Sequence, residues 1–104
     1  MTKQYPVAKA SELHSGEMKL VVANRERFLL ANVDGVFYVI SDTCTHKRSS
    51  LSEGVLEGCV VECPLHFARF DVRTGEFIDG PYTTNVARYE VAVQGDTVYV
   101  EMSG

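Results

Sequence analysis

The sequence predicts an all-β domain with antiparallel pairing, built as a sandwich or a small barrel. Short runs rich in β-branched and aromatic residues recur at intervals of about 8–12 residues, a spacing typical of such folds. Turn-forming residues separate these runs and interrupt the chain too often for a long helix. No repeat or linker divides the 104 residues, so residues 1–104 are expected to form a single domain.

The N-terminal half predicts three strands. Lys19–Ala23 ends at the turn Asn24–Glu26, and the apolar run Arg27–Val33 follows it. Asp34-Gly35 then predicts a hairpin turn, because both residues tolerate a positive φ, and Val36–Ile40 forms the returning strand.

The C-terminal part predicts a second hairpin. Val86–Val93 alternates apolar and polar residues, turns at Gln94–Asp96 and returns as Thr97–Glu101. Helical character is confined to Ala8–Leu13, which gives one turn at most, with Ser11 as a weak candidate cap.

Composition excludes several classes of function. The hydrophobic share of 45% and the charged share of 23% are ordinary for a soluble globular chain, and no apolar run approaches the ~20 residues of a membrane span. A net charge of −4 argues against a nucleic-acid partner. Three cysteines suit no closed disulfide framework, and the N-terminus lacks a signal sequence, which together predict a cytoplasmic location. We expect a monomer.

Two short motifs combine cysteine with histidine. They are Cys44-Thr45-His46 and Cys63-Pro64-Leu65-His66, and sixteen residues separate them. Strand candidates at Val55-Leu56 and Cys59–Val61 lie in this interval and predict an out-and-back hairpin that brings the two motifs together. Thiolate and imidazole are ligands that iron and zinc prefer, so the four side chains predict a metal site.

These four side chains alone leave the choice between zinc and iron open. A zinc site with two cysteines and two histidines is one possibility, and a structural zinc module in a binding protein would then be the function. Structural zinc typically uses a pair of cysteines followed by a pair of histidines, whereas each motif here offers one of each.

This arrangement resembles the Rieske iron–sulfur proteins, whose motif is Cys-x-His followed, after a similar interval, by Cys-x2-His. Other segments also resemble the family sequence, namely Leu51–Gly54, Phe70-Asp71 and the proline-containing Gly80-Pro81. The resemblance implies an antiparallel β-sandwich with a cluster-binding subdomain of two loops within residues 41–81. It also implies one [2Fe–2S] cluster, with one iron held by Cys44 and Cys63 and the other by His46 and His66.

The ligand set and its neighbours predict a redox potential at the low end of the Rieske range. Neutral imidazoles leave less negative charge than four thiolates would, so accepting an electron is less opposed. Respiratory Rieske proteins add a disulfide and two hydroxyl donors, and the matching positions here are Ser49, Leu65, Ala68 and Phe70. Fewer donors to the cluster sulfurs predict a potential on the order of −150 mV.

A low potential and a small chain resemble the Rieske-type ferredoxins of bacterial aromatic-ring dioxygenase systems. There, electrons pass from NAD(P)H through a flavoprotein ferredoxin reductase to the ferredoxin, and then to a terminal oxygenase of aromatic hydrocarbon catabolism. The chain has no dinucleotide-binding fingerprint and no facial triad of two His and one carboxylate, so we expect a carrier and not an enzyme. The alternative is the Rieske small subunit of an assimilatory nitrite reductase.

Seven other residues carry expectations of their own. Cys59 is predicted to be a buried filler within a strand, and His14 to be exposed. Lys47 and Arg48 form either a solvated turn or a docking site for acidic groups. Phe67 stands where the family often has glycine. Gly80-Pro81 is expected to begin a third loop that covers the cluster.

Overall fold

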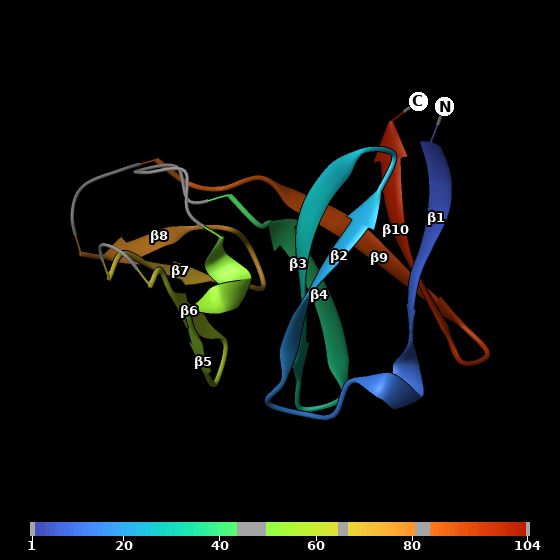
Figure 1. The fold of residues 1–104 in the computed structure, drawn as a ribbon, viewed down its shortest axis with the longest axis horizontal. Helices are drawn as coiled ribbons and strands as arrows, with labels where there is room; N and C mark the ends of the chain where they lie inside the picture. Colours follow the sequence, from blue (N-terminus) through green and yellow to red (C-terminus); the bar gives the residue numbers. More distant parts are fainter. Residues whose placement is uncertain (1, 44–49, 65–66, 81–83, 104) are drawn as a thin grey trace.

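The computed structural model describes residues 2–43, 50–64, 67–80 and 84–103, which form two antiparallel sheets (Figure 1). A six-stranded sheet has the strand order β1-β10-β9-β4-β3-β2, and a four-stranded sheet has the order β5-β6-β7-β8. The strands are β1 (Thr2–Lys9), β2 (Met18–Ala23), β3 (Glu26–Val33), β4 (Val36–Ser41), β5 (Val55–Glu57), β6 (Val60–Glu62), β7 (Arg69–Asp71), β8 (Phe77–Asp79), β9 (Arg88–Gln94) and β10 (Thr97–Ser103). The predicted all-β class is confirmed.

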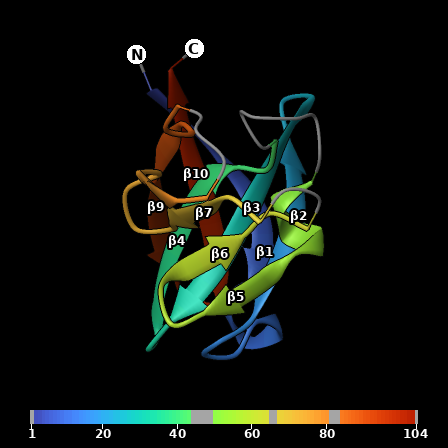
Figure 2. The same cartoon turned by 90° about the vertical axis from the view of Figure 1, so that its left-hand side faces the viewer.

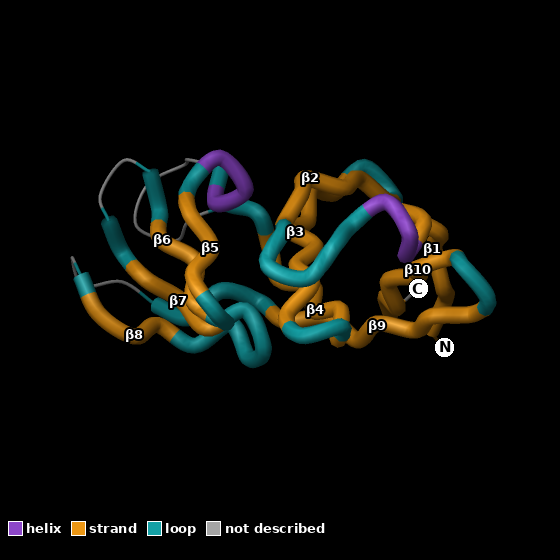
Figure 3. Tube along the Cα trace, turned by 90° about the horizontal axis from the view of Figure 1, so that it is seen from below, coloured by secondary structure: helices purple, strands orange, loops and turns teal. Residues whose placement is uncertain are grey.

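The six-stranded sheet curls so that its two edge strands, β1 and β2, come close to each other (Figure 3). Strands β1, β10 and β9 form one layer of the resulting sandwich, and β4, β3 and β2 form the other. An apolar cluster fills the space between the layers, with Phe28, Leu30, Val39, Val98 and Val100 almost fully buried. Burial of these side chains stabilises the curl.

Strand β3 is buried on both faces. Phe28 and Leu30 point into the cluster between the layers, whereas Leu29 and Ala31 point to a second apolar cluster beneath the four-stranded sheet. The two clusters explain why this run is continuously apolar, because a strand covered on both sides has no solvent face. Figure 2 shows the four-stranded sheet lying in front of β3 and β4.

The four-stranded sheet lies within residues 41–81, where the sequence predicted two ligand loops and strands only at Val55-Leu56 and Cys59–Val61. Its inward row takes one apolar residue from each strand: Leu56 pairs with Val61, Val61 with Phe70, and Phe70 with Phe77. Each strand has only three residues, too few for alternation to be visible in the sequence. The predicted loops are therefore carried by a small sheet of their own.

The N-terminal segment differs in two ways from the sequence-based expectation. Thr2–Lys9 forms an edge strand that pairs with β10, with a register shift after Pro6. The predicted helical turn is a 3-10 turn, η1 (Ala10–Glu12), in which the Glu12 side chain accepts a hydrogen bond from the Lys9 backbone N–H. Ser11 is not the cap, because its hydroxyl donates to Asp96 across the fold.

Two details of the turns follow from local geometry. Asp34 and Gly35 form the predicted hairpin turn, with φ angles of 53° and 88°. Cys59 lies in the turn between β5 and β6 and not within a strand, and its side chain is half-buried. Within the described ranges, no helix is long and apolar enough to cross a membrane.

Candidate metal centre

The structure places one of the four predicted ligands. Cys63 directly follows β6, and its side chain is completely buried. Cys44, His46 and His66 lie outside the described residues, as do Lys47 and Arg48. In the part of the chain that is described, no group of three or more His, Cys, Asp or Glu side chains is placed to hold one metal ion. The evidence for the site therefore comes from the residues that flank the two motifs.

The base of the first ligand loop is closed by backbone pairing. Thr43 and Ser50, on either side of the Cys44–His46 motif, form an antiparallel bridge. The backbone N–H of Leu51 donates to the carbonyl of Asp42 at 2.7 Å. The chain thus returns to within hydrogen-bonding distance of β4 before it enters the short 3-10 turn η2 (Leu51–Glu53).

Asp42 connects the two sides of this loop base. Its side chain is 1% exposed, and its carboxylate accepts hydrogen bonds from the Ser50 hydroxyl and from the Ser52 backbone N–H, the latter at 2.9 Å. The Arg27 guanidinium lies 3.6 Å from the same carboxylate and supplies a positive charge. A buried charge is tolerated only with such partners, so Asp42 holds the loop base in one geometry.

We expect Asp42→Asn to lower the free energy of unfolding by about 1–3 kcal/mol, because one of the two oxygens that accept these hydrogen bonds becomes an NH2 donor and the charge that faces Arg27 is lost. Urea unfolding of the anaerobic protein measures this change. Arg27→Gln is the matched control, and should cost less than about 1 kcal/mol because the Arg27 side chain is more than half exposed. Wild-type stability of Asp42→Asn would contradict the proposed role.

The second ligand loop is closed by two backbone hydrogen bonds. The N–H of Cys63 donates to the Ala68 carbonyl at 2.8 Å, and the N–H of Phe67 donates to the Cys63 carbonyl at 3.0 Å. Just outside them, Glu62 pairs with Arg69 at the end of the β6–β7 ladder. The loop is therefore a tight connection between two strands, with Cys63 at its start.

Gly54 brings the two loop bases together. A Cβ atom on Gly54 would collide with the carbonyl oxygen of Glu62, the residue before Cys63. Leu51, Cys63 and Ala68 are all completely buried in one apolar cluster. The segment that leaves the first motif thus packs directly against the segment that enters the second, which supports the predicted convergence of the motifs.

A third segment, which ends at Gly80, packs against the second loop. A Cβ atom on Gly80, whose φ is 108°, would lie 2.8 Å from the Ala68 Cα and 2.9 Å from the Phe67 oxygen. The chain that leads to Pro81 therefore touches the second ligand loop. This contact supports a third loop at Gly80-Pro81, although Pro81 itself lies outside the described residues.

The backbone of Phe67 explains why glycine suits this position. Its φ of 61° lies in the left-handed region, which costs a residue with a Cβ atom roughly 1–2 kcal/mol. Glycine adopts the same conformation without that cost. Sequence reasoning noted the departure from glycine but did not predict the strain.

Arginine–carboxylate pairs brace both ends of β7. The Arg69 guanidinium donates two hydrogen bonds to Asp79, which lower the pKa of Asp79 and raise that of Arg69. Arg73 donates to Asp71 and lowers the pKa of that carboxyl. All four groups therefore stay charged at neutral pH, and the outer face of the small sheet carries both signs of charge.

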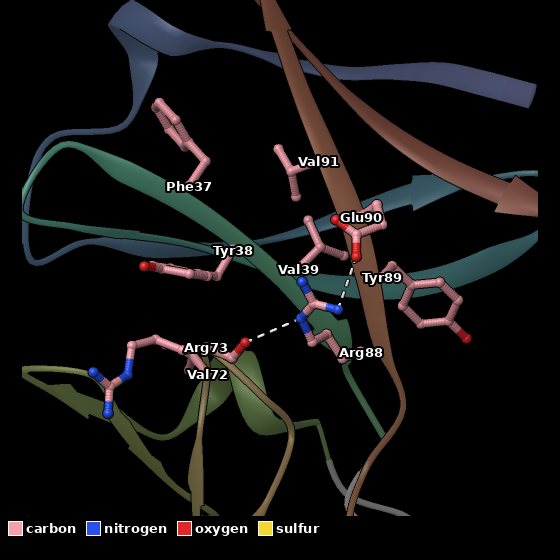
Figure 4. Close-up of a pocket in the computed structure, with 9 residues that line it drawn as sticks. All are labelled: Phe37, Tyr38, Val39, Val72, Arg73, Arg88, Tyr89, Glu90 and Val91. Atoms are coloured by element: carbon pink, nitrogen blue, oxygen red, sulfur yellow. Dashed lines mark hydrogen bonds and ion pairs between the residues drawn. The ribbon is translucent and has the colours of Figure 1, made fainter.

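A pocket of about 190 Å³ lies where the small sheet meets β4 and β9 (Figure 4). Arg88 crosses it, donating a hydrogen bond to the Arg73 carbonyl at 3.1 Å and pairing with Glu90 at 2.9 Å. The described residues that line the pocket include neither cysteine nor histidine, so it is not a candidate metal site. The hydrogen bond from Arg88 in β9 to the Arg73 carbonyl, just after β7, connects the small sheet to the large one.

The surroundings of Cys63 fit an iron–sulfur cluster. A buried thiol at the end of a strand, with apolar Leu51 and Ala68 in the same cluster, offers a soft ligand shielded from water. Sequence reasoning missed Asp42, and it included Gly54 in the family segment Leu51–Gly54 without assigning it a role. The signal for Asp42 is its place between the end of a strand and the first motif, with Ser50 and Ser52 just beyond that motif.

Comparison with known protein families identifies the family to which the chain belongs. Residues 3–90 match the family model described as "Rieske [2Fe-2S] domain". The chain belongs to the Rieske [2Fe–2S] domain family, which confirms both the resemblance and the predicted [2Fe–2S] cofactor.

Among individual relatives, the chain is similar to ferredoxin components of aromatic dioxygenase systems. It is 40% identical over 98 residues to that of biphenyl 2,3-dioxygenase from Rhodococcus jostii (strain RHA1), covering 94% of this chain and 92% of the relative. It is 37% identical over 92 residues to that of the naphthalene 1,2-dioxygenase system from Pseudomonas aeruginosa, covering 88% of each.

Among solved structures, the chain is also similar to ferredoxins of dioxygenase systems. The ferredoxin of carbazole 1,9a-dioxygenase from Nocardioides aromaticivorans IC177 superposes with a TM-score of 0.90 at 31% identity, covering 94% of this chain and 96% of that chain. A chain in a complex of reduced oxygenase and oxidized ferredoxin in carbazole 1,9a-dioxygenase has a TM-score of 0.88 at 38% identity, covering 93% and 91%. The fold prediction is confirmed.

Proposed function

We propose that this protein is an electron-transfer ferredoxin of an aromatic-ring-hydroxylating oxygenase system. It takes single electrons from an NAD(P)H-dependent flavoprotein ferredoxin reductase and passes them to the terminal oxygenase. The observation that carries the proposal is the near full-length match, on both sides, to ferredoxin components of such systems. These relatives favour a carrier over the small subunit of a nitrite reductase.

The proposed ligands are Cys44 and Cys63 on one iron, and His46 and His66 on the other. Bound there, the cluster supplies one reversible electron. The chain's own part is to hold and shield it: Asp42 fixes the base of the first loop, Gly54 brings that base against Glu62, and buried Leu51 and Ala68 exclude water beside Cys63.

We propose a carrier without catalysis of its own. A Rieske cluster alone exchanges electrons, whereas oxidation of a nicotinamide needs a dinucleotide site and activation of oxygen needs a second iron centre. The partners would then be the reductase and the oxygenase, each bound weakly and in turn. Pairing of β1 with β10, and of β9 with β4, supports residues 1–104 as one domain.

A potential at the low end of the Rieske range is part of the proposal. Ala68, whose carbonyl closes the Cys63 loop, and Phe70 are completely buried, and neither side chain can donate a hydrogen bond. The Phe70 ring instead packs edge-on against Phe77 at a centroid distance of 5.9 Å. With no hydroxyl from these positions, a midpoint potential of about −150 mV is expected, which protein-film voltammetry measures.

The function is tested by reconstitution. We expect anaerobically purified protein to contain two irons and two acid-labile sulfides per chain, and to transfer electrons from NAD(P)H and reductase to at least one terminal oxygenase. Oxygenases of the naphthalene, biphenyl and carbazole systems form the test panel, with hydroxylated product as the readout. A colourless protein that contains zinc would contradict the assignment of an iron–sulfur cluster. An iron-containing protein that supports no oxygenase but co-purifies with a nitrite reductase would contradict the assignment of the oxygenase as partner.

A further inference from the structure

The side chain of Phe67 is exposed although its backbone is strained. The ring is 62% exposed, and neither apolar cluster of the described residues includes it. Its φ of 61° is one that glycine adopts freely and that a phenylalanine adopts only at a cost. Packing among the described residues therefore gives no reason for an aromatic side chain at this position. A strained residue with an exposed ring indicates a role toward a partner.

The backbone around Phe67 is held on two sides. Its N–H donates to the Cys63 carbonyl, and its own carbonyl lies against Gly80. Phe67 also follows the predicted ligand His66 in the sequence. The ring is consequently presented outward from a fixed position beside the proposed cluster. A rigid aromatic side chain loses little freedom on binding, which makes it an effective contact.

The face next to this loop is apolar and acidic. Val55 and Ile78, 54% and 45% exposed, line a groove of about 240 Å³ on the outer face of the small sheet. Glu57, Glu62 and Arg69 line the same groove. Arg69 is paired with Asp79, whereas neither glutamate forms an ion pair within the described part of the chain, so the groove keeps an excess of negative charge. Glu62 and Arg69 form the last strand pair before the loop that holds Phe67, so the groove reaches the strand ends from which that loop leaves. A partner that covers both must offer apolar and basic groups.

We propose that Phe67 is an apolar anchor that seats this protein on the terminal oxygenase, in an apolar recess bordered by lysine or arginine side chains. The inference rests on the proposed function and names the contact that brings the two proteins together. The acidic groove steers the approach, and the ring fixes the final position. The reaction is the transfer of one electron from the reduced ferredoxin to the oxidised oxygenase, with no bond formed or broken.

Three variants distinguish a role of the Phe67 ring in docking from the effect of the strained Phe67 backbone. Phe67→Ala removes the ring and keeps the Cβ atom, Phe67→Gly removes both, and Phe67→Leu keeps an apolar side chain. Asp34→Gly is the matched control, because Asp34 has a similar φ of 53° in the β3–β4 turn, at the other end of β4 from the base of the first ligand loop (Figure 1). Each protein is reduced with dithionite and mixed, in a stopped-flow instrument, with an oxygenase that accepts electrons from the wild-type protein.

We expect Phe67→Ala and Phe67→Gly to lower the second-order rate constant for oxygenase reduction about tenfold. Phe67→Leu and Asp34→Gly should stay within about threefold of wild type. The absorption spectrum and midpoint potential should not change. Phe67→Gly should unfold roughly 5 °C higher than Phe67→Ala, because only glycine relieves the backbone.

Several results would overturn the inference. They are a wild-type rate in Phe67→Gly, a loss that appears only with the reductase, or a loss that follows a shifted midpoint potential, which would make the ring a shield of the cluster. Equal unfolding temperatures of the alanine and glycine variants would remove the argument from strain. If the wild-type protein itself reduces no oxygenase, the proposed function fails, and that failure is seen before any variant is made.

Discussion

Cys63→Ser is expected to abolish the Rieske cluster. Serine keeps the size of the side chain but replaces the soft thiolate that iron prefers, and Cys59, the other described thiol, lies at the opposite end of β6. The purified variant should contain less than about a tenth of the wild-type iron and labile sulfide. Its visible absorption and the electron paramagnetic resonance signal of the reduced protein should both be lost.

Cys59→Ser is the matched control for this change. Cys59 lies in the β5–β6 turn, half-buried, where it makes a backbone hydrogen bond through its carbonyl to the N–H of Val72. A serine there keeps that bond, so iron content and spectrum should equal those of the wild type. A Cys63→Ser protein with normal iron and an unchanged signal would remove this residue from the ligand set.

Gly54→Ala is expected to cause the second-largest effect. The added Cβ atom would collide with the backbone oxygen of Glu62, which no change of rotamer can move. We expect the free energy of unfolding to fall by about 3 kcal/mol, and cluster occupancy to fall with it, because the two loop bases are pushed apart. Urea unfolding, followed by circular dichroism and by visible absorption, measures both effects.

Gly58→Ala serves as the control for Gly54→Ala. A Cβ atom on Gly58 meets no atom within 4 Å, although its φ of 60° adds strain of roughly 1 kcal/mol. This variant should therefore lose a little stability and keep its cluster. Equal losses in the two glycine variants would show that the contact between Gly54 and Glu62 does not hold the loop bases together.

The hairpins of the large sheet were predictable because their turn and strand residues determine them locally. Asp34 and Gly35 adopt the positive φ that their side chains permit, and the strands on either side follow from β-branched and aromatic residues. Strand β1 was not predicted, because Pro6 cannot donate a hydrogen bond and argues against a strand. The fold accommodates it at a sheet edge with a register shift directly after the proline.

The candidate site was only partly predictable. Spacing identified the two motifs, but Asp42 became visible only when the fold placed Ser50 and Ser52 against its carboxylate. Cys59 was placed wrongly in a strand, since a Val-rich run does not show where a two-residue turn begins. Such contacts depend on tertiary packing, which local sequence does not encode.

Both ends of the chain lie beside each other at the far side of the large sheet from β5–β8 (Figures 1 and 3). Thr2 pairs with Ser103, so the ends are one strand spacing apart. A protein fused to either end, or a short linker that closes the chain into a circle, would leave the small sheet uncovered. The molecule can therefore be tethered to an electrode or to a redox partner while the end that carries β5–β8 remains free to meet another protein.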